Sequence, residues 1–220
     1  MIVYADAFSS VDWDGKIVCT VFMAGCPFEC WYCHNSDLIR PAKESKKDEI
    51  FKIINVSKDF IDGICVTGGE PTMHRDELVS LLEFAKDNDL RVKLDTNGYY
   101  PEVLKEVIEC GLVDYVAMDV KEKFENYSCL MLREMKIDAE KLRKSVNIIM
   151  DSGVDYEFRT TVLDCSKDWI FGVAEQVKGA KKYALQRLRL GGQFIFDKKD
   201  FDSVVEYLEI EEWFDEVVVR

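Results

Sequence analysis

Residues 25–35 read Gly25-Cys26-Pro27-Phe28-Glu29-Cys30-Trp31-Tyr32-Cys33-His34-Asn35 and hold three cysteines at C-x3-C-x2-C spacing. Three thiolates this close together can share one metal centre. A [4Fe-4S] cluster has four irons that each take one protein thiolate, so three cysteines would leave one iron open to a ligand from outside the protein. The spacing therefore predicts a metal centre with an open, reactive position.

A four-coordinate zinc site is the alternative for the same stretch, with Cys26, Cys30, Cys33 and His34 as ligands. His34 directly follows Cys33, however, and adjacent residues rarely turn both side chains toward one tetrahedral ion. Most structural zinc sites pair two short ligand segments far apart in sequence, and the chain has no second C-x2-C. A zinc-binding interaction module is therefore the least favoured reading.

The composition is that of an acidic globular protein. The chain has 220 residues, which suits one α/β domain spanning residues 1–220. Lys and Arg number 29 against 42 for Asp and Glu, a net charge of -13 that opposes binding to nucleic acid. No apolar run approaches the roughly 18 residues of a membrane helix, and residues 1–6 do not resemble a signal peptide. We expect a cytoplasmic protein with no membrane and no nucleic-acid partner.

Eight cysteines in a chain without a secretion signal argue against a disulfide framework, because reducing compartments keep thiols free. Five of them are scattered among mostly apolar neighbours, and there a cysteine usually behaves as a small buried hydrophobe. These are Cys19, Cys65, Cys110, Cys129 and Cys165.

Strand-like and helix-like patterns alternate along the chain. Strands are expected at 2–7, 17–23, 61–67, 90–95, 115–120, 155–162, 183–188 and 214–219, and helices at 48–54, 78–85, 101–108, 139–149, 169–177 and 201–208. Asp14-Gly15 suits a turn that pairs the first two strands as a hairpin. The alternation implies a parallel sheet with right-handed crossovers, either doubly wound or curled toward a barrel. A complete eight-unit barrel takes about 250 residues, more than the chain has.

Polar residues follow the expected strands. Ligands of parallel α/β folds bind at the carboxyl ends of the strands, so these residues should share one rim. They are the cysteine loop, then Thr67-Gly68-Gly69-Glu70-Pro71, Asp95-Thr96-Asn97-Gly98, Asp119, Lys121, Glu157, Arg159, Thr160 and Gln186. Each group alone could be only a turn, a helix cap or a solvated pair. Together with the cysteines they predict an active site.

Four motifs in order carry a family resemblance: C-x3-C-x2-C, Gly-Gly-Glu-Pro, Asp-Thr-Asn-Gly and Met-Asp-x-Lys. The chain resembles the radical S-adenosylmethionine (radical SAM) superfamily and, within it, the glycyl-radical activating enzymes. It most resembles anaerobic ribonucleotide reductase activating proteins, and next pyruvate formate-lyase activating enzymes. With the flanks at 11–15 and 156–162, the resemblance covers a core of about residues 10–190 and leaves an extension at about 191–220. It implies a partial (β/α)6 TIM-like barrel in a single domain.

The resemblance also implies cofactors. In the superfamily, SAM chelates the open iron, and an electron from the cluster cleaves SAM to methionine and a 5′-deoxyadenosyl radical. The cluster ligands would be Cys26, Cys30 and Cys33. The residues that resemble SAM-binding positions are Tyr32, His34, Gly68, Gly69, Glu70, Pro71, Asn97, Lys121, Arg159 and Gln186. Asp95, Thr96, Met118 and Asp119 resemble a monovalent cation site, for which hard oxygen ligands are suitable.

Within these sets the resemblance gives individual roles. Tyr32 would present its backbone to the adenine, and Gly68, Gly69 and Glu70 would receive the amino group of SAM. Lys121 would meet the SAM carboxylate. His34 and Asn35 match a His-Asn step of the family, for which a hydrogen bond that merely orders the loop is an equal alternative.

The implied reaction removes the pro-S hydrogen from a glycine of an anaerobic ribonucleotide reductase, with a flavodoxin- or ferredoxin-type electron donor. Residues 35–67 hold no further C-x-x-C pair, so we expect a one-cluster enzyme. An incomplete barrel with few insertions would leave an open mouth, which suits a protein substrate. The small-molecule alternative is an enzyme like 7-carboxy-7-deazaguanine synthase, which usually has a different cysteine spacing.

Overall fold

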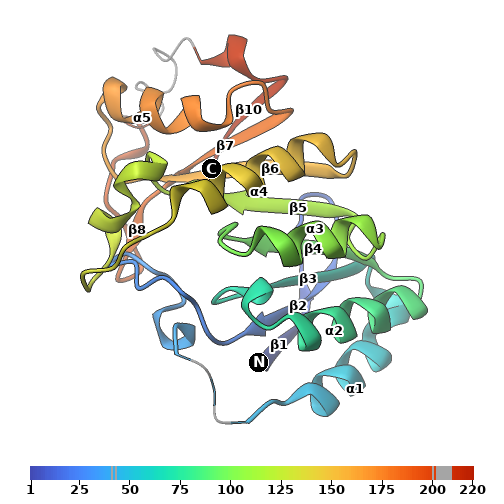
Figure 1. Cartoon of the computed structure of the whole chain (residues 1–220). Coiled ribbons are helices and arrows are strands. Elements are labelled where there is room, and N and C mark those ends of the chain that lie inside the picture. The colour runs from blue at the N-terminus through green and yellow to red at the C-terminus, as the bar shows by residue number, and fades with distance from the viewer. Residues whose placement is uncertain (41, 43, 200, 202–209) are drawn as a thin grey trace.

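The computed structural model describes residues 1–40, 42, 44–199, 201 and 210–220, and within them one sheet of eight strands follows the order of the sequence (Figure 1). Its order is β1-β2-β3-β4-β5-β6-β7-β10. β1 is antiparallel to β2, and every later pair is parallel. The strands are β1 (Ile2–Ser9), β2 (Val18–Met23), β3 (Gly63–Gly68), β4 (Arg91–Thr96), β5 (Tyr115–Asp119), β6 (Asp155–Val162), β7 (Lys182–Arg187) and β10 (Glu216–Val219).

Helices connect the parallel strands. They are α1 (Lys47–Ser57), α2 (Arg75–Asp87), α3 (Pro101–Glu109), α4 (Ala139–Asp151) and α5 (Lys167–Ala174). Shorter 3-10 segments lie at Ser36–Leu38, Lys58–Phe60, Pro71–Met73, Phe124–Leu130, Glu175–Val177 and Glu211–Trp213. Because the strand order never reverses, right-handed crossovers place the helices on one face of the sheet, as Figure 1 shows for α2, α3 and α4. A doubly wound sheet is thereby ruled out.

The sheet curls into a partial barrel, as the resemblance implies. Arg220, which follows β10, forms an ion pair with Asp14 in the turn between β1 and β2. These residues belong to opposite edges of the sheet, so the edges approach each other. β10 was expected as a strand, and its parallel pairing with β7 adds it to the barrel beyond the six predicted units.

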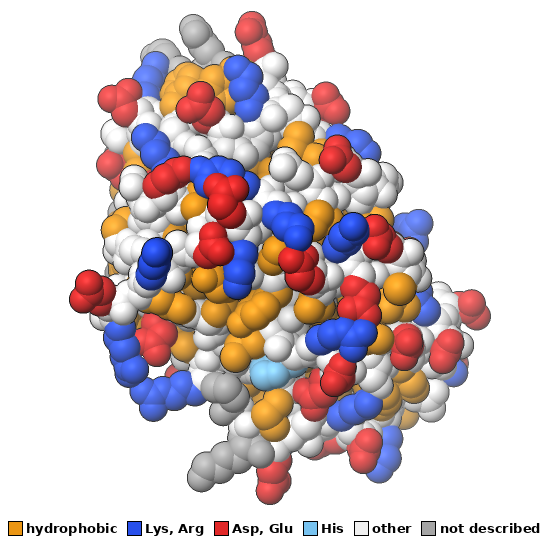
Figure 2. Space-filling model, viewed as in Figure 1, with side chains coloured by type: hydrophobic (Ala, Val, Ile, Leu, Met, Phe, Trp, Pro, Cys, Tyr) orange, Lys and Arg blue, Asp and Glu red, His pale blue; other side chains and the backbone are white. Residues whose placement is uncertain are grey.

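The two faces of the sheet differ in chemistry. In β4, Val92 and Leu94 are fully buried in the apolar layer shared with the helices. Lys93 and Asp95 alternate with them and therefore point to the opposite face, the barrel interior. The barrel thus has an apolar outer layer and a polar interior. Figure 2 shows acidic and basic side chains interspersed over the visible outer surface.

Other predictions had mixed outcomes. The hairpin around Asp14-Gly15 is confirmed by the antiparallel β1–β2 pair. Gly191 and Gly192 form the turn of a small hairpin between β8 (Arg189–Leu190) and β9 (Gln193–Phe194). The helix predicted at 201–208 lies outside the described residues except for Phe201. No helix among the described residues is both long and apolar enough to cross a membrane.

The expectation for the scattered cysteines was partly wrong. Cys19 and Cys65 are buried, as predicted. Cys110 and Cys129 are exposed, and Cys165 is only partly buried. Cys110 follows the last turn of α3, and Cys129 belongs to the 3-10 segment Phe124–Leu130. Both segments are amphipathic, and apolar sequence neighbours do not determine which way one side chain points.

Candidate active site

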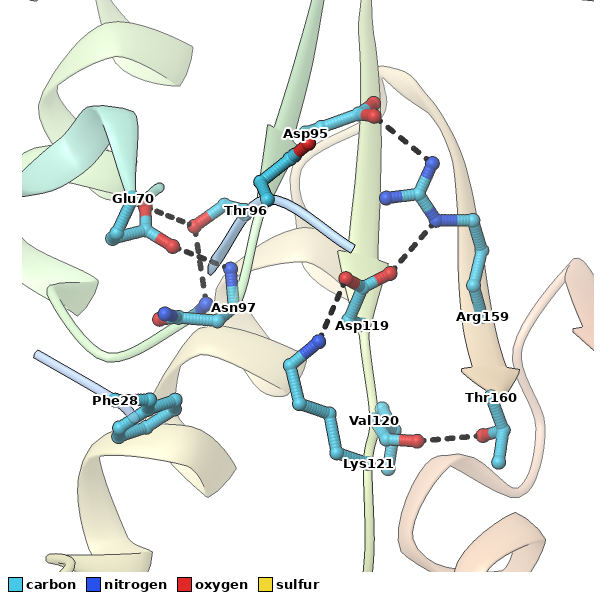
Figure 3. Close-up of polar contacts among 12 residues, drawn as sticks. Phe28, Glu70, Asp95, Thr96, Asn97, Asp119, Val120, Lys121, Arg159 and Thr160 are labelled. Atoms are coloured by element: carbon cyan, nitrogen blue, oxygen red, sulfur yellow. Dashed lines mark hydrogen bonds and ion pairs between the residues drawn. The ribbon is translucent and has the colours of Figure 1, made fainter. Parts of the chain in front are cut away.

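A cavity of about 390 Å³ lies at the carboxyl ends of the parallel strands. Residues from the loop after β2 and from β3, β4, β5, β6 and β7 line it, so most of the predicted shared rim is present. Glu157 and Thr160, also predicted on the rim, are buried and do not line the cavity. The lining residues are Cys26, Phe28, Cys30, Tyr32, Cys33, His34, Asn35, Thr67, Gly68, Gly69, Asp95, Thr96, Asn97, Asp119, Lys121, Arg159, Thr161, Gln186 and Arg187. Figure 3 shows the polar contacts of its inner wall.

The cysteine loop is held by backbone hydrogen bonds at both ends. Near its start, the Cys26 N–H donates to the Ile39 carbonyl at 2.9 Å. Farther along, the Trp31 N–H donates to the Leu130 carbonyl at 3.1 Å. These bonds join the cysteine loop to Ile39 and to the end of the 3-10 segment Phe124–Leu130. This fixed backbone brings Cys26, Cys30 and Cys33 to one cavity wall as free thiols.

Burial favours the protonated thiol at two of the three cysteines, Cys26 and Cys30. Burial, with a smaller contribution from Glu70, raises the pKa of Cys26 to about 12. Burial also raises the pKa of Cys30. Because metal ligation requires thiolates, binding a metal centre here would release protons. Among the described residues no group of three or more His, Cys, Asp or Glu is arranged to hold a single metal ion. The three thiols share one wall of a cavity of about 390 Å³, which has room for a larger cluster.

Gly68 and Gly69 pack against the cysteine loop. The Gly69 N–H donates to the Met23 carbonyl, and the Glu70 N–H donates to the Gly25 carbonyl, both at 2.7 Å. A Cβ on Gly68 would overlap Met23, and one on Gly69 would overlap the carbonyl oxygen of Gly25. The paired glycines were expected to admit a ligand, and they also let two stretches of backbone meet.

Glu70 does not line the cavity, unlike the prediction that it receives the SAM amino group. Its side chain is fully buried, and Oε1 accepts hydrogen bonds from Thr72 N, Thr72 Oγ1 and Thr96 Oγ1 at 3.1, 2.5 and 2.7 Å. Oε2 accepts from Asn97 N at 2.6 Å (Figure 3). The carboxylate therefore joins the glycine loop to the loop after β4.

Five alternating charges cross the barrel interior, from Lys93 through Asp95, Arg159 and Asp119 to Lys121. Lys93 Nζ lies 2.8 Å from Asp95 Oδ1, although that oxygen accepts no well-aligned hydrogen bond. Arg159 donates from Nη1 to Asp95 Oδ2 at 3.0 Å and from Nε to Asp119 Oδ1 at 2.9 Å. Lys121 Nζ donates to Asp119 Oδ2 at 2.9 Å. Three cations and two anions leave one excess positive charge.

Lys121 ends this chain of charges and lines the cavity together with Asp95, Asp119 and Arg159. Burial alone would lower the pKa of Lys121, but Asp119, with smaller contributions from Tyr32 and Cys30, raises that pKa well above the ordinary value. Burial alone would raise the pKa of Asp119, but Arg159 and Lys121 hold it well below the ordinary value. All five groups stay charged at neutral pH, so the cavity presents a permanent cation suited to an anionic ligand.

The predicted cation site does not have its carboxylates free. Both oxygens of Asp95 and both of Asp119 already lie beside a lysine or arginine nitrogen. Thr96 donates its hydroxyl to Glu70, and Met118 is fully buried and does not line the cavity. A metal cation could take these oxygens only by displacing the side-chain cations.

The remaining predicted residues divide between the cavity and its surroundings. Tyr32, His34, Asn97 and Gln186 line the cavity, whereas Pro71 is buried outside it. The Tyr32 hydroxyl is buried without a hydrogen-bond partner among the described residues. The sequence analysis placed Thr67 on the rim but did not single out three other lining residues, Phe28, Thr161 and Arg187. Arg187 directly follows the predicted Gln186 at the end of β7, so its place in the sequence could have predicted it as a lining residue.

Comparison with known proteins agrees with this geometry. The model of the radical SAM superfamily matches residues 20–165. A candidate glycyl-radical enzyme activating enzyme from Methanocaldococcus jannaschii is 34% identical over 186 residues, which cover 81% of this chain and 76% of that protein. The pyruvate formate-lyase-activating enzyme of Streptococcus mutans is 36% identical over 129 residues, covering 53% of this chain and 49% of that protein.

A solved structure has the same fold. SuiB from Streptococcus suis, bound to S-adenosylmethionine, superposes with a TM-score of 0.67 at 15% identity. The match covers 90% of this chain and 48% of SuiB, so the chain spans about half of that protein.

Proposed function

Because the chain belongs to the radical SAM superfamily, we propose that it activates an anaerobic ribonucleotide reductase by removing a hydrogen atom from one of its glycines. The family uses a [4Fe-4S] cluster and SAM. When bound, they supply the electron and the 5′-deoxyadenosyl group that takes the hydrogen. The observation that carries the proposal is the meeting of three free cysteines, a double-glycine edge and a partly buried lysine at one cavity.

Cys26, Cys30 and Cys33 would hold the cluster. Their thiols line the same cavity, so an iron left without a protein thiolate would face that space. Asn35 supports this arrangement, because its Nδ2 donates to the Gly68 carbonyl at 3.0 Å and ties the cysteine loop to the glycine edge.

Lys121 and the glycine edge would hold SAM. The five-residue chain carries one excess positive charge and ends at Lys121, whose ammonium group would suit the SAM carboxylate. Gly68 and Gly69 offer backbone to an amino group. Tyr32, His34, Arg159 and Gln186 would complete the wall, with Arg159 acting by fixing Asp119 and hence Lys121.

Exposed apolar side chains around the mouth support a protein as the substrate. Trp31 is 45% exposed, Leu132 67%, Phe194 51% and Ile195 49%. Trp31 belongs to the cysteine loop and Leu132 to the segment after Leu130, while Phe194 and Ile195 lie in and beside the β8–β9 hairpin. These three segments lie together at the left of Figure 1. Large apolar side chains gathered at a site mouth are typical of protein-binding surfaces.

The same mouth offers positive charge. Arg187 and Arg189 lie over the Phe194 ring, and neither has an ion-pair partner in the described part of the chain. They could meet carbonyl or carboxylate groups of a partner's loop. We also propose that residues 1–220 act as one domain, because β10 of the predicted extension pairs with β7 of the core.

Electron paramagnetic resonance (EPR) tests the function. The protein is reconstituted anaerobically with iron and sulfide, reduced, and incubated with SAM and a purified anaerobic ribonucleotide reductase. We expect a glycyl-radical doublet that disappears when the partner's radical glycine is replaced by alanine. A flavodoxin or ferredoxin should replace the chemical reductant.

Pyruvate formate-lyase is the matched alternative partner. A doublet on that enzyme and none on the reductase would overturn the choice of partner. SAM cleavage without a doublet on either protein would instead favour a small-molecule substrate.

A further inference from the structure

Asn97 connects the buried Glu70 carboxylate to a cysteine of the site. Its backbone N–H donates to Glu70 Oε2 at 2.6 Å. Its side-chain Oδ1 accepts from Tyr99 N at 3.0 Å, and its Nδ2 donates to Cys26 Sγ at 3.6 Å. Asn97 is only 6% exposed, so three contacts hold it with little access to water.

The contact with Tyr99 determines which way the amide faces. A backbone N–H can only donate, so the Asn97 atom opposite it must be the carbonyl oxygen. The flipped amide would bring two donors together at this point. The amino group of Asn97 therefore faces the sulfur of Cys26.

Cys26 is unlike the other two cysteines in this respect. Its sulfur also accepts from Phe28 N at 3.4 Å. No side chain in the described ranges donates a hydrogen bond to the sulfur of Cys30 or Cys33. Among the described residues, Asn97 is therefore the side chain that donates a hydrogen bond to a sulfur of the three cysteines.

We propose that Asn97 raises the reduction potential of the cluster by holding its amide N–H against Cys26 Sγ. The inference rests on the proposed role of Cys26 as a cluster ligand. Reduction adds one electron from the external donor, and part of the added negative charge falls on the thiolate sulfurs. A fixed N–H donor stabilises that charge more in the reduced than in the oxidised state. Asn97, which the resemblance assigns to SAM, thus acts on the cluster.

Potentiometric titration followed by EPR, without SAM or a partner, measures this effect. Asn97→Leu removes the donor at similar size. We expect the equilibrium constant for one-electron reduction to fall about tenfold, which lowers the midpoint potential by about 59 mV. An unchanged potential would overturn the inference.

Thr161→Val is the matched control. It removes a polar group from the same cavity at similar size, and the Thr161 hydroxyl donates to no sulfur among the described residues. Its potential should stay at the wild-type value. If both variants shift equally, general loss of cavity polarity is the cause and the proposed hydrogen bond is refuted.

Asn97→Asp keeps the shape and the acceptor for Tyr99 but has no donor for Cys26. Its potential should fall at least as far, and it decides the matter if the leucine variant assembles no cluster. If neither variant assembles a cluster, pulsed EPR of protein with ¹⁵N-labelled asparagine tests the contact. The measurement uses Asn35→Leu, so that Asn97 is the asparagine side chain left at the cavity. The reduced cluster must then show a ¹⁵N coupling, and its absence refutes the hydrogen bond. A wild-type protein that binds no cluster would refute the proposed function instead.

Discussion

Arg159 lies directly opposite Asp119 in the parallel β5–β6 pair, and its Nε donates to Asp119 Oδ1 at 2.9 Å. The same guanidinium reaches Asp95 on the next strand, β4. One side chain therefore joins three neighbouring strands across the barrel interior. Asp95 and Asp119 therefore share Arg159 as an ion-pair partner.

Replacing Arg159 should destabilise the fold strongly. Arg159→Leu would leave two buried carboxylates undercompensated, and we expect a loss of about 3–5 kcal/mol in the free energy of unfolding. Urea titration measures it. Arg143→Leu breaks surface pairs with Glu125 and Glu140 and should cost only about 0–1 kcal/mol. Similar losses in the two variants would contradict a structural role for the buried network.

Acid should weaken the same network. Burial alone would raise the pKa of Asp119, but Arg159 and Lys121 hold it well below its unfolded value of 3.8. A lowered folded pKa adds stability that is present above the unfolded value and lost as the pH falls below it. Asp119→Asn should therefore be less stable at neutral pH and lose less of its remaining free energy of unfolding between about pH 6 and about pH 3. Parallel pH profiles would show that Asp119 contributes nothing.

Gly69 should not tolerate a side chain. An alanine Cβ would overlap the carbonyl oxygen of Gly25 and lie 2.9 Å from that of Leu38, and both belong to backbone that cannot rotate away. We expect Gly69→Ala to cost about 1–3 kcal/mol in unfolding free energy and to impair cluster assembly. Iron content and urea titration measure the two effects.

Gly172 provides the control for that substitution. It lies within α5, and a Cβ there would meet only the flexible end of Lys123. Because alanine is favoured over glycine in a helix by about 0.8–1 kcal/mol, Gly172→Ala should be at least as stable as wild type. Equal damage at both positions would argue against the backbone clash at Gly69.

Cys30→Ala should abolish cluster binding. The wild-type protein should hold about four irons per chain after anaerobic reconstitution and cleave SAM to 5′-deoxyadenosine when reduced. The variant should do neither. Cys110→Ala makes the same chemical change at an exposed position outside the cavity and should behave as wild type. Persistent SAM cleavage by Cys30→Ala would disprove the cluster assignment.

Local patterns in the sequence predicted the strands and the rim. Parallel strands bring their carboxyl ends together, so the cysteine loop, Gly68-Gly69 and Lys121 could be assigned to one site before any contact was known. Partners across the barrel were harder to predict, because they depend on register. The pairing of Asp119 with Arg159 follows from their positions in β5 and β6, which the sequence does not specify.

Glu70 illustrates the same limit at a single residue. Its place in Gly-Gly-Glu-Pro suggested a ligand contact. The carboxylate instead turns toward Thr96, the last residue of β4, and Asn97, which directly follows it. A polar residue in a rim motif can be buried, and only the tertiary hydrogen bonds determine which way it turns.

The unbroken strand order also bears on how the protein can form. Each strand of the eight-stranded sheet pairs with the strand of that sheet that precedes it in the sequence, so during synthesis a new strand meets a neighbour that has already emerged. The link between Arg220 and Asp14 spans nearly the whole chain and must come last. The sheet can therefore assemble in the direction of translation. Contact between its two edges forms last, long after the cysteine loop has been synthesised.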